Sequence, residues 1–371
     1  MKRFFFLVII IIVCVNAWPY VEKQLDQTEN SLIIQTVKED ISSIMEDDYL
    51  HVFISSFQSL LHKLENALDV QEEQPSQIDQ PELGEPVHHI FSILNIEIGD
   101  RKRDVELILG EPKRISYNEY GTNWYTYHED FHHFLNVMYN EKEEVIGLYT
   151  NQDLVSSTNG IVLGSSKEEV LKQLGEPLSA IRKGLVLYRL QGDNDYHIFQ
   201  VDGSFVTIFY DKHEEDTVTA IQLIDEQTEK NKKEIYTVST DELAKGFEFQ
   251  MFDLTNATRV NHSLQTLTWD EHVSETARKH SVDMAENDYF NHTNLQGQSP
   301  FDRMKEDQLF FVLAGENLAY GQLSSIFAHE GLMNSLGHRE NILKDDYKYL
   351  GVGVAFNEEN HPYYTQNYYA K

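Results

Sequence analysis

Two histidines and one glutamate stand in three short polar segments of the last third of the chain: Phe290-Asn291-His292, Gly315-Glu316-Asn317 and Gly337-His338-Arg339. Helical and strand patterns surround these segments, so His292, Glu316 and His338 could converge in one cleft. Two neutral imidazoles and a carboxylate are the ligands of an open zinc site that activates water. Without metal, Glu316 could polarise a histidine acting as a general base. A structural role is the third alternative, in which both histidines bond Glu316 and hold loops to a sheet.

Composition excludes several classes of protein. The chain has 371 residues, 41% hydrophobic and 25% charged, which is enough for two or more domains with their own cores. The formal net charge of −31 disfavours nucleic acid and anionic membrane surfaces as partners. Cys14 is the only cysteine, so metal–thiolate sites and disulfide frameworks are excluded.

The first residues are typical of an export signal. Met1-Lys2-Arg3 precedes an apolar run from Phe4 to Val15, and Val15-Asn16-Ala17 offers small or apolar residues to a signal peptidase. A retained membrane anchor is the alternative, but the run is shorter than the roughly 20 residues of a spanning helix. We therefore expect residues 1–17 to be a signal peptide and the mature protein to be secreted, with no membrane span.

Residues 18–90 are expected to hold an acidic amphipathic helix followed by a linker. Apolar residues recur three and four apart between Leu50 and Leu68, which is the spacing of one helical face. Pro75, Pro81 and Pro86 follow among acidic and glutamine residues, a composition that disfavours regular structure.

Residues 91–228 contain an internal repeat. Segment 99–112 returns as segment 164–177, and each copy has a glycine and polar cap, a helix with Val105 or Val170 facing inward, and a Gly-Glu-Pro stop. Alternating residues after each copy predict strands at 123–127, 134–139 and 145–150, then at 185–190, 205–210 and 218–223. Each copy is thus predicted to be a helix on a small antiparallel sheet.

Three histidines of this region, His128, His132 and His133, lie close enough in sequence to suggest a metal site. The surrounding polar residues favour the tip of a hairpin between two strands instead.

A charged linker is expected at residues 229–245, followed by a last domain at 246–371. Helical spacing covers residues 253–260, 273–286 and 327–336, with Gly337 as the last helix stop, and Pro300 starts a short helix. Strand patterns lie at residues 310–313, 351–355 and 363–368. Helices that bracket a short sheet predict an α/β/α sandwich, so the whole chain belongs to the α+β class.

The motifs of this last domain occur in the order found in a known family. They are Tyr289-Phe290-Asn291-His292, Gly297-Gln298-Ser299-Pro300, Gly315-Glu316-Asn317, the run from Met333 to Leu343, and Gly351-Val352-Gly353. They resemble the bacterial branch of the CAP superfamily, which includes cysteine-rich secretory proteins, antigen 5-like venom proteins and plant pathogenesis-related proteins. The repeat region resembles the CAP-associated N-terminal domain of exported Gram-positive proteins.

The resemblance implies a cleft lined by two histidines and two glutamates. His292, Glu316 and His338 match three of these positions, whereas the fourth falls on Ser335. Glu330 lies five residues earlier on the same predicted helix, an offset of more than one turn that points it elsewhere. Ser335 and Glu330 are the remaining candidate cleft residues, and no aspartate or oxyanion-hole pattern completes a triad with Ser335 and His338.

Other polar and glycine residues near the cleft have structural interpretations. His280 is expected to be a buried structural histidine, and Arg303 and Asn341 are expected to fix loops by hydrogen bonds. Gly315 and Gly337 are expected to adopt backbone conformations that residues with a Cβ avoid.

Two functions follow from these observations. We favour a non-enzymatic secreted protein whose cleft binds an extracellular ligand such as a wall component, a lipid or a peptide, with Zn²⁺ or another divalent cation as a candidate cofactor. The alternative is a metal-assisted hydrolase that uses His292, Glu316 and His338. The resemblance alone implies association with the cell envelope, since a fold does not name a ligand.

Overall fold

The structure is a computed structural model that describes residues 80–190 and 195–371. The predicted signal segment and the amphipathic helix lie outside the described residues. The described residues, 80–190 and 195–371, belong to one compact unit. Within its described part, we call residues 91–231 the first module and residues 241–371 the second module. No helix in these described ranges is both long and apolar enough to cross a membrane.

The first module is built on one antiparallel sheet of seven strands, in the order β2-β3-β4-β5-β11-β10-β9. The strands are β2 (Arg114–Tyr117), β3 (Asn123–Glu129), β4 (His132–Tyr139), β5 (Val145–Thr150), β9 (Tyr196–Val201), β10 (Ser204–Asp211) and β11 (Thr217–Asp225). The sequence predicted a small sheet for each repeat copy. The two halves instead form one sheet, because β5 pairs with β11 from Gly147 opposite Ile224 to Thr150 opposite Ile221.

Three helices and two small ladders surround this sheet. They are α4 (Lys102–Leu109), α5 (Lys167–Leu174) and α6 (Glu226–Asn231), the ladder of β1 (Phe91–Ile93) with β6 (Val155–Ser157), and the ladder of β7 (Ala180–Lys183) with β8 (Val186–Arg189). Val105 and Val170 are the buried residues of α4 and α5, as predicted.

The two predicted repeat copies make matching backbone bonds. The N–H of Gly99 donates to the carbonyl of Val145, and the N–H of Gly164 donates to that of Val218, both at 2.8 Å. Helices α4 and α5 end at Gly110 and Gly175, whose φ angles of 74° and 79° are left-handed values that glycine adopts without strain.

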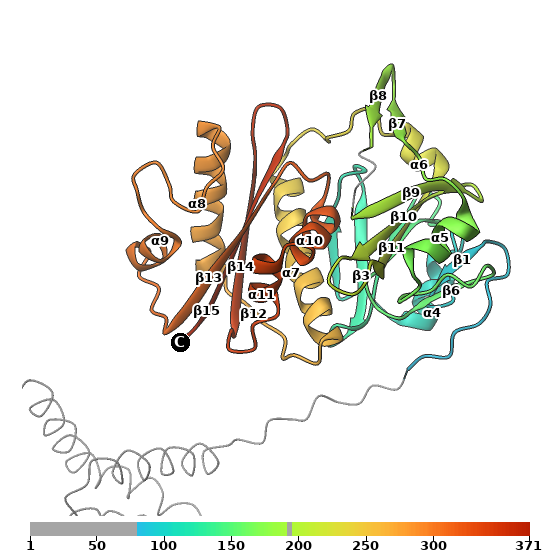
Figure 1. Ribbon diagram of the computed structural model, residues 1–371, viewed down its shortest axis with the longest axis horizontal. Helices are drawn as coiled ribbons and strands as arrows, with labels where there is room; N and C mark the ends of the chain where they lie inside the picture. The colour runs from blue at the N-terminus through green and yellow to red at the C-terminus, as the bar shows by residue number, and fades with distance from the viewer. Residues whose placement is uncertain (1–79, 191–194) are drawn as a thin grey trace, which may run out of the picture. The chain divides into compact units, whose positions relative to one another are not determined.

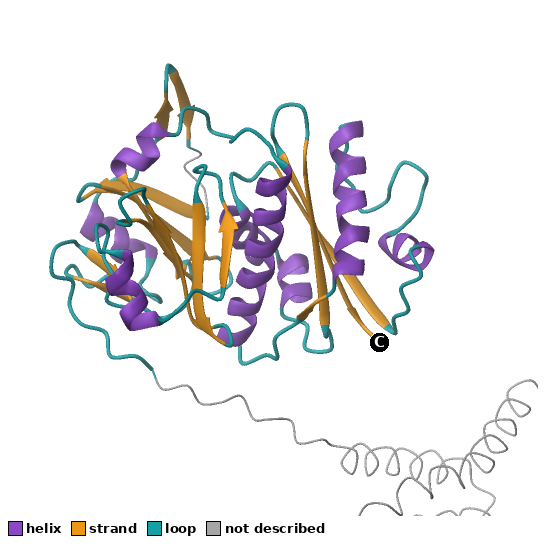
Figure 2. Cartoon of the chain, turned by 180° about the vertical axis from the view of Figure 1, so that it is seen from behind, coloured by secondary structure: helices purple, strands orange, loops and turns teal. Residues whose placement is uncertain are grey.

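The second module is a four-stranded sheet between two layers of helices (Figures 1 and 2). The strands, in sheet order, are β12 (Thr268–Trp269), β14 (Tyr349–Phe356), β15 (Pro362–Ala370) and β13 (Leu313–Tyr320). Helices α8 (Glu271–Asn287) and α9 (Pro300–Glu306) lie on one side, and α7 (Asp241–Asn261), α10 (Ser325–Met333) and α11 (Leu336–Ile342) lie on the other. This confirms the predicted α/β/α sandwich.

Two glycines of β14 let α8 approach the sheet closely. A Cβ on Gly351 would lie 2.2 Å from the backbone nitrogen of Ser274, and one on Gly353 would lie 2.0 Å from that of Arg278. Alternate residues of a strand share a face, so both glycines open the same face to the helix. The Gly-Val-Gly motif is therefore a packing requirement.

Several predicted boundaries in the second module were wrong. Helix α7 begins at Asp241, inside the predicted linker, because the Thr240 side chain accepts the N–H of Leu243 at 3.0 Å and caps the helix. Strand β13 covers residues 313–320, so Glu316 is on a strand. Gly337 lies inside α11 and stops no helix. The break comes at Ser335, whose backbone is extended.

The two modules share a buried interface. Trp124, Phe134 and Phe209 from the seven-stranded sheet form one cluster with Leu254 of α7 and Ile326 of α10. Ion pairs cross the same boundary, with Arg114 Nε 2.7 Å from Asp253 and Arg339 Nη1 2.8 Å from Asp211. The layer of helices α7 and α10 thus packs against both sheets. Figure 1 shows one sheet on each side of this layer.

Candidate functional site

The candidate site lies at the β13 edge of the four-stranded sheet. Glu316 is in the middle of β13, His292 is in the loop between α8 and α9, and His338 is in α11. The three residues therefore come from three different elements, as the sequence predicted.

Glu316 is the buried centre of an ion cluster. Its Oε1 lies 2.9 Å from Nδ1 of His292, and its Oε2 accepts a hydrogen bond of 2.6 Å from Nη2 of Arg303. The Glu316 and Arg303 side chains are 1% and 8% exposed, whereas the His292 side chain is 51% exposed. Because Nδ1 of His292 faces the carboxylate, Nε2 is the ring atom left for a ligand.

Arg303 also fixes the loop that carries His292. Its Nη1 donates to the carbonyl of His292 at 2.8 Å and to that of Gln298 at 3.2 Å. The loop ends in a capping box between Ser299 and Asp302 with Pro300 in the first turn, which sets the start of α9 and so the place of Arg303. Loop fixing was predicted for Arg303, but its ion pair with Glu316 was not.

His338 lies within electrostatic reach of His292. Burial lowers the pKa of His338, and the charge of His292 lowers it further. Its Nδ1 is 2.8 Å from the hydroxyl of Ser335, which places this candidate cleft residue beside the imidazole. Nδ2 of Asn317 donates to the carbonyl of His338 at 3.1 Å and so ties α11 to β13.

The predicted metal set of His292, Glu316 and His338 does not form a preorganised metal site. Both oxygens of Glu316 are already bonded, one to an imidazole and one to a guanidinium. Among residues 80–190 and 195–371, no group of three or more His, Cys, Asp or Glu side chains is arranged to hold a metal ion. Glu316 therefore orients His292, and it is not placed as a direct ligand.

Glu330 faces the first module and not the histidines. It is 4% exposed, and one of its oxygens accepts a hydrogen bond of 2.7 Å from the Tyr149 hydroxyl of β5. The prediction that Glu330 is a cleft residue was therefore wrong. Its offset of five residues from Ser335 is more than one helical turn, so the two side chains point in different directions.

Gly315 has a packing role and not the conformational one that we expected. A Cβ there would lie 2.2 Å from the hydroxyl of Tyr347 and 2.9 Å from Oδ1 of Asn341. A Cβ on Gly337 would meet no atom within 4 Å, and its φ is not positive.

His128, His132 and His133 lie at the β3–β4 hairpin tip, as predicted. Nδ1 of His128 accepts the N–H of Phe131 at 3.0 Å, and the two rings stack with centroids 4.3 Å apart. Burial lowers the pKa of His128 to about 4, so this imidazole is neutral at pH 7.

Of two buried polar residues next to the cluster, the sequence predicted the role of one and not of the other. His280 is buried and its Nε2 lies 3.0 Å from the carbonyl of Asn291, so its predicted structural role is confirmed. Asn367 of β15 is directly opposite Glu316 and fully buried, and sequence reasoning missed it. The available signal was the polar run Thr365-Gln366-Asn367 between two pairs of tyrosines.

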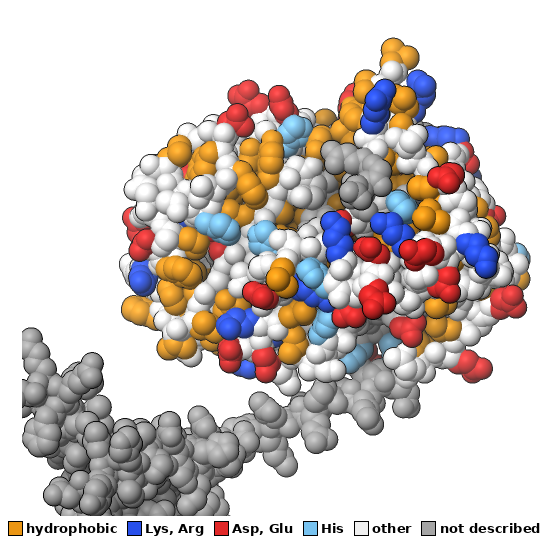
Figure 3. All heavy atoms as spheres, in the orientation of Figure 1, with side chains coloured by type: hydrophobic (Ala, Val, Ile, Leu, Met, Phe, Trp, Pro, Cys, Tyr) orange, Lys and Arg blue, Asp and Glu red, His pale blue; other side chains and the backbone are white. Residues whose placement is uncertain are grey.

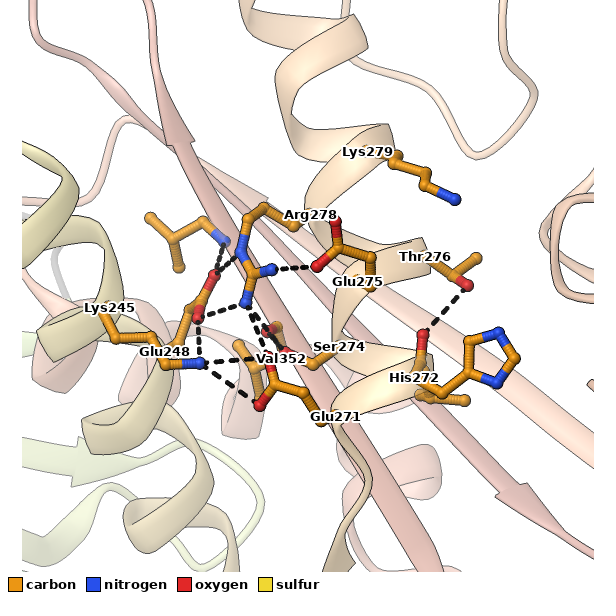
Figure 4. A network of polar contacts seen from close by, with 12 residues as sticks. Lys245, Glu248, Glu271, His272, Ser274, Glu275, Thr276, Arg278, Lys279 and Val352 are labelled. Atoms are coloured by element: carbon orange, nitrogen blue, oxygen red, sulfur yellow. Dashed lines mark hydrogen bonds and ion pairs between the residues drawn. The ribbon is translucent and has the colours of Figure 1, made fainter. Parts of the chain in front are cut away.

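A second polar network closes the opposite edge of the sheet (Figure 4). Strand β12 pairs with Tyr349 and Leu350 of β14, and no other strand in the described part of the chain pairs with the rest of that edge. Glu248 of α7 accepts the N–H of Val354 at 3.2 Å and pairs with Arg278 Nε of α8 at 2.7 Å. A pocket of about 540 Å³ is lined in part by these charged residues and Lys245.

The surface near the candidate site combines imidazole and apolar groups. Phe290, Tyr320 and Leu336 are 48%, 37% and 60% exposed, and the rings of Phe290 and Tyr320 are 5.9 Å apart. On the face drawn in Figure 3, histidine and hydrophobic side chains lie next to each other over the second module.

Comparisons with known proteins agree with this architecture. Residues 98–235 match the CAP-associated N-terminal family, and residues 252–368 match the cysteine-rich secretory protein family. A Bacillus subtilis protein named uncharacterized membrane protein YlbC is 32% identical over 311 residues, which are 78% of this chain and 87% of that protein. Uncharacterized protein YkwD of the same organism is 37% identical over 135 residues, 36% of this chain and 51% of YkwD.

Two solved structures share the fold over both modules. An extracellular protein with an SCP domain from Bacillus anthracis has a TM-score of 0.64 and 25% identity, covering 81% of this chain and 100% of its own. A cysteine-rich secretory protein from Staphylococcus aureus has a TM-score of 0.60 and 15% identity, with 79% and 100% covered.

Proposed function

Because the chain belongs to the cysteine-rich secretory protein (CAP) family and carries the CAP-associated N-terminal domain, we propose that it is an exported protein that binds a cell-wall component through the cleft at His292 and His338. The hydrogen bonds of Glu316 with His292 and Arg303 are the main support for this proposal. A buried carboxylate that already has an imidazole and a guanidinium as partners holds His292 in place and offers a substrate no free base.

The chemistry around the cleft supports the choice of ligand. The half-exposed His292 presents a hydrogen-bonding ring atom, and the exposed Phe290 and Leu336 each lie two residues before one of the two histidines. Such a surface suits a ligand with both apolar and hydrogen-bonding groups, such as a glycan that carries peptides.

The names of two relatives support a location at the envelope. The Bacillus anthracis protein is described as extracellular, and the Bacillus subtilis protein is named a membrane protein. An exported protein that stays near the wall is compatible with both descriptions.

Co-sedimentation with purified peptidoglycan tests the proposal. The wild type and His272→Ala should sediment with the wall, and the double variant His292→Ala with His338→Ala should stay in solution. His272 is an exposed histidine of α8 whose ring makes none of the contacts drawn in Figure 4, so it is a matched control. Equal sedimentation of all three proteins would exclude the cleft as the binding site.

The same preparation distinguishes binding from hydrolysis. Zinc-dependent release of soluble wall fragments that is lost in His338→Ala would replace the binding function with metal-assisted hydrolysis. Binding without such release supports the proposal.

A further inference from the structure

A pocket of about 460 Å³ is lined by residues of both modules, and neither His292 nor His338 is among them. Its walls include Tyr188 of β8 and Tyr196 of β9 from the first module and Phe327 and Glu330 of α10 from the second. Tyr236, between the modules, and Gln322, after β13, also line the pocket. This volume is in the range of small-ligand sites.

Three tyrosines and two phenylalanines make the pocket aromatic. The rings of Tyr196 and Phe327 come from different modules and meet edge to face with centroids 5.0 Å apart. The Tyr236 hydroxyl donates to the carbonyl of Gly321 at 2.6 Å, which holds the β13–α10 loop against the segment between the modules. Contacts from both modules therefore hold the aromatic wall of the pocket in place.

Two residues that line this pocket carry buried acceptor atoms. Glu330 is 4% exposed, and one of its oxygens is bonded to Tyr149. Oε1 of Gln322 is buried and has no hydrogen-bond partner among the described residues. The other two charged residues of the lining, Arg189 and Asp195, have opposite signs. Arg189 is exposed and Asp195 pairs with Lys212.

Aromatic faces attract cations, and a carboxylate with an amide oxygen accepts the hydrogen bonds of an ammonium group. From this combination we propose that the pocket binds a primary alkylammonium group, supplied by a lysine side chain of a peptide or by a free diamine. The net charge of −31 favours the approach of such a cation. The inference does not rest on the wall-binding function, because it uses none of the cleft residues.

Calorimetry with the full chain at pH 8, where the Glu330 carboxyl group is mainly ionised, tests this site with n-butylammonium, n-butanol and butyrate as probes of equal chain length. Butylammonium should bind about tenfold more tightly than butanol, and butyrate should bind more weakly than both. Equal affinity for butylammonium and butanol would overturn the proposal.

Three variants locate the binding. Glu330→Gln keeps an acceptor for Tyr149 but removes the charge, so it should weaken butylammonium binding about tenfold. Tyr188→Ala should weaken it severalfold, and Leu187→Ala, a half-exposed neighbour on β8 outside the lining, should leave it unchanged. Wild-type affinity in Glu330→Gln would refute the assignment.

N-acetyl-lysine-methylamide and cadaverine distinguish the two sources of the group. Tighter binding of the lysine derivative supports a peptide ligand, and tighter binding of cadaverine supports a free diamine. Failure of both to bind would refute the site.

Discussion

The hydroxyl of Tyr149 donates a hydrogen bond of 2.7 Å to the carboxylate of Glu330 across the boundary between the two modules. Burial and the charge of Asp211 raise the pKa of Glu330, the bond from Tyr149 and the charge of Arg339 lower it, and the resulting pKa is about 7. From this position we expect the stability of the interface to depend on pH.

Replacing Glu330 with glutamine should remove a pH dependence of stability. A glutamate of the unfolded chain titrates near 4.3, so the folded state favours the protonated form. Its contribution to the free energy of unfolding is complete below that pKa and is lost as the pH rises through about 7. Urea unfolding from pH 5 to 8 should show that the wild type loses about 3 kcal/mol relative to Glu330→Gln.

Tyr149→Phe provides the control for this prediction. The variant keeps the carboxyl group but removes the donor that lowers its pKa, so the dependence on pH should persist. Stability curves of the wild type and Glu330→Gln that run parallel over this range would show that the carboxyl group does not titrate as the structure indicates.

The pKa of His338 should rise in His292→Gln. In the wild type, burial and the charge of His292 both hold it below the value of a free histidine. Glutamine keeps a polar side chain at position 292 but cannot carry a positive charge. Titration of the imidazole proton signals by NMR measures the change, and His272→Ala should leave the pKa of His338 unaffected. An unchanged value in His292→Gln would mean that the two imidazoles are electrostatically independent.

Local sequence patterns predicted the elements that carry the candidate site. The sequence predicted helix α8, the order of strands β14 and β15, and the segments that carry His292, Glu316 and His338, because periodicity and helix caps are properties of neighbouring residues. The sequence did not predict the limits of β13 and α11. For α11 the reason is that Ser335 breaks the helix without a glycine or proline.

Contacts between distant segments explain what the sequence could not predict. The ion pair of Arg303 with Glu316 joins two elements, and the bond of Tyr149 to Glu330 joins residues 181 positions apart. Neither follows from the spacing of residue types. The joining of the predicted small sheets through β5 and β11 is equally non-local, and it creates the face on which α7 and α10 pack.

Removing Arg303 alone should destabilise the protein more than removing its whole ion pair. Arg303→Met leaves the carboxylate of Glu316 buried without its guanidinium, which we expect to cost about 3–5 kcal/mol of unfolding free energy. The double variant with Glu316→Gln removes the buried charge as well and should recover part of this loss. Chemical denaturation of the single and double variants measures both effects.

The ion pair between the exposed Lys279 and the partly exposed Asp307 provides the reference for that experiment. The Lys279 side chain is 59% exposed and its Nζ is 2.8 Å from Asp307. Lys279→Met should therefore change the free energy of unfolding by less than about 1 kcal/mol. A loss in Arg303→Met no larger than in Lys279→Met would contradict the burial of the charge.

Two glycine substitutions should have opposite effects on stability. A Cβ in Gly353→Ala would lie 2.0 Å from the backbone nitrogen of Arg278, so α8 would have to move away from β14 at a cost of about 3 kcal/mol or more. Gly337→Ala adds its Cβ in open space inside α11, where alanine is the better helix former, and should stabilise the protein by about 0.5–1 kcal/mol. Thermal unfolding of the two variants measures both changes. A destabilised Gly337→Ala would show that position 337 needs a conformation that alanine cannot adopt, and an unaffected Gly353→Ala would show that the α8 layer is not closely packed on the sheet.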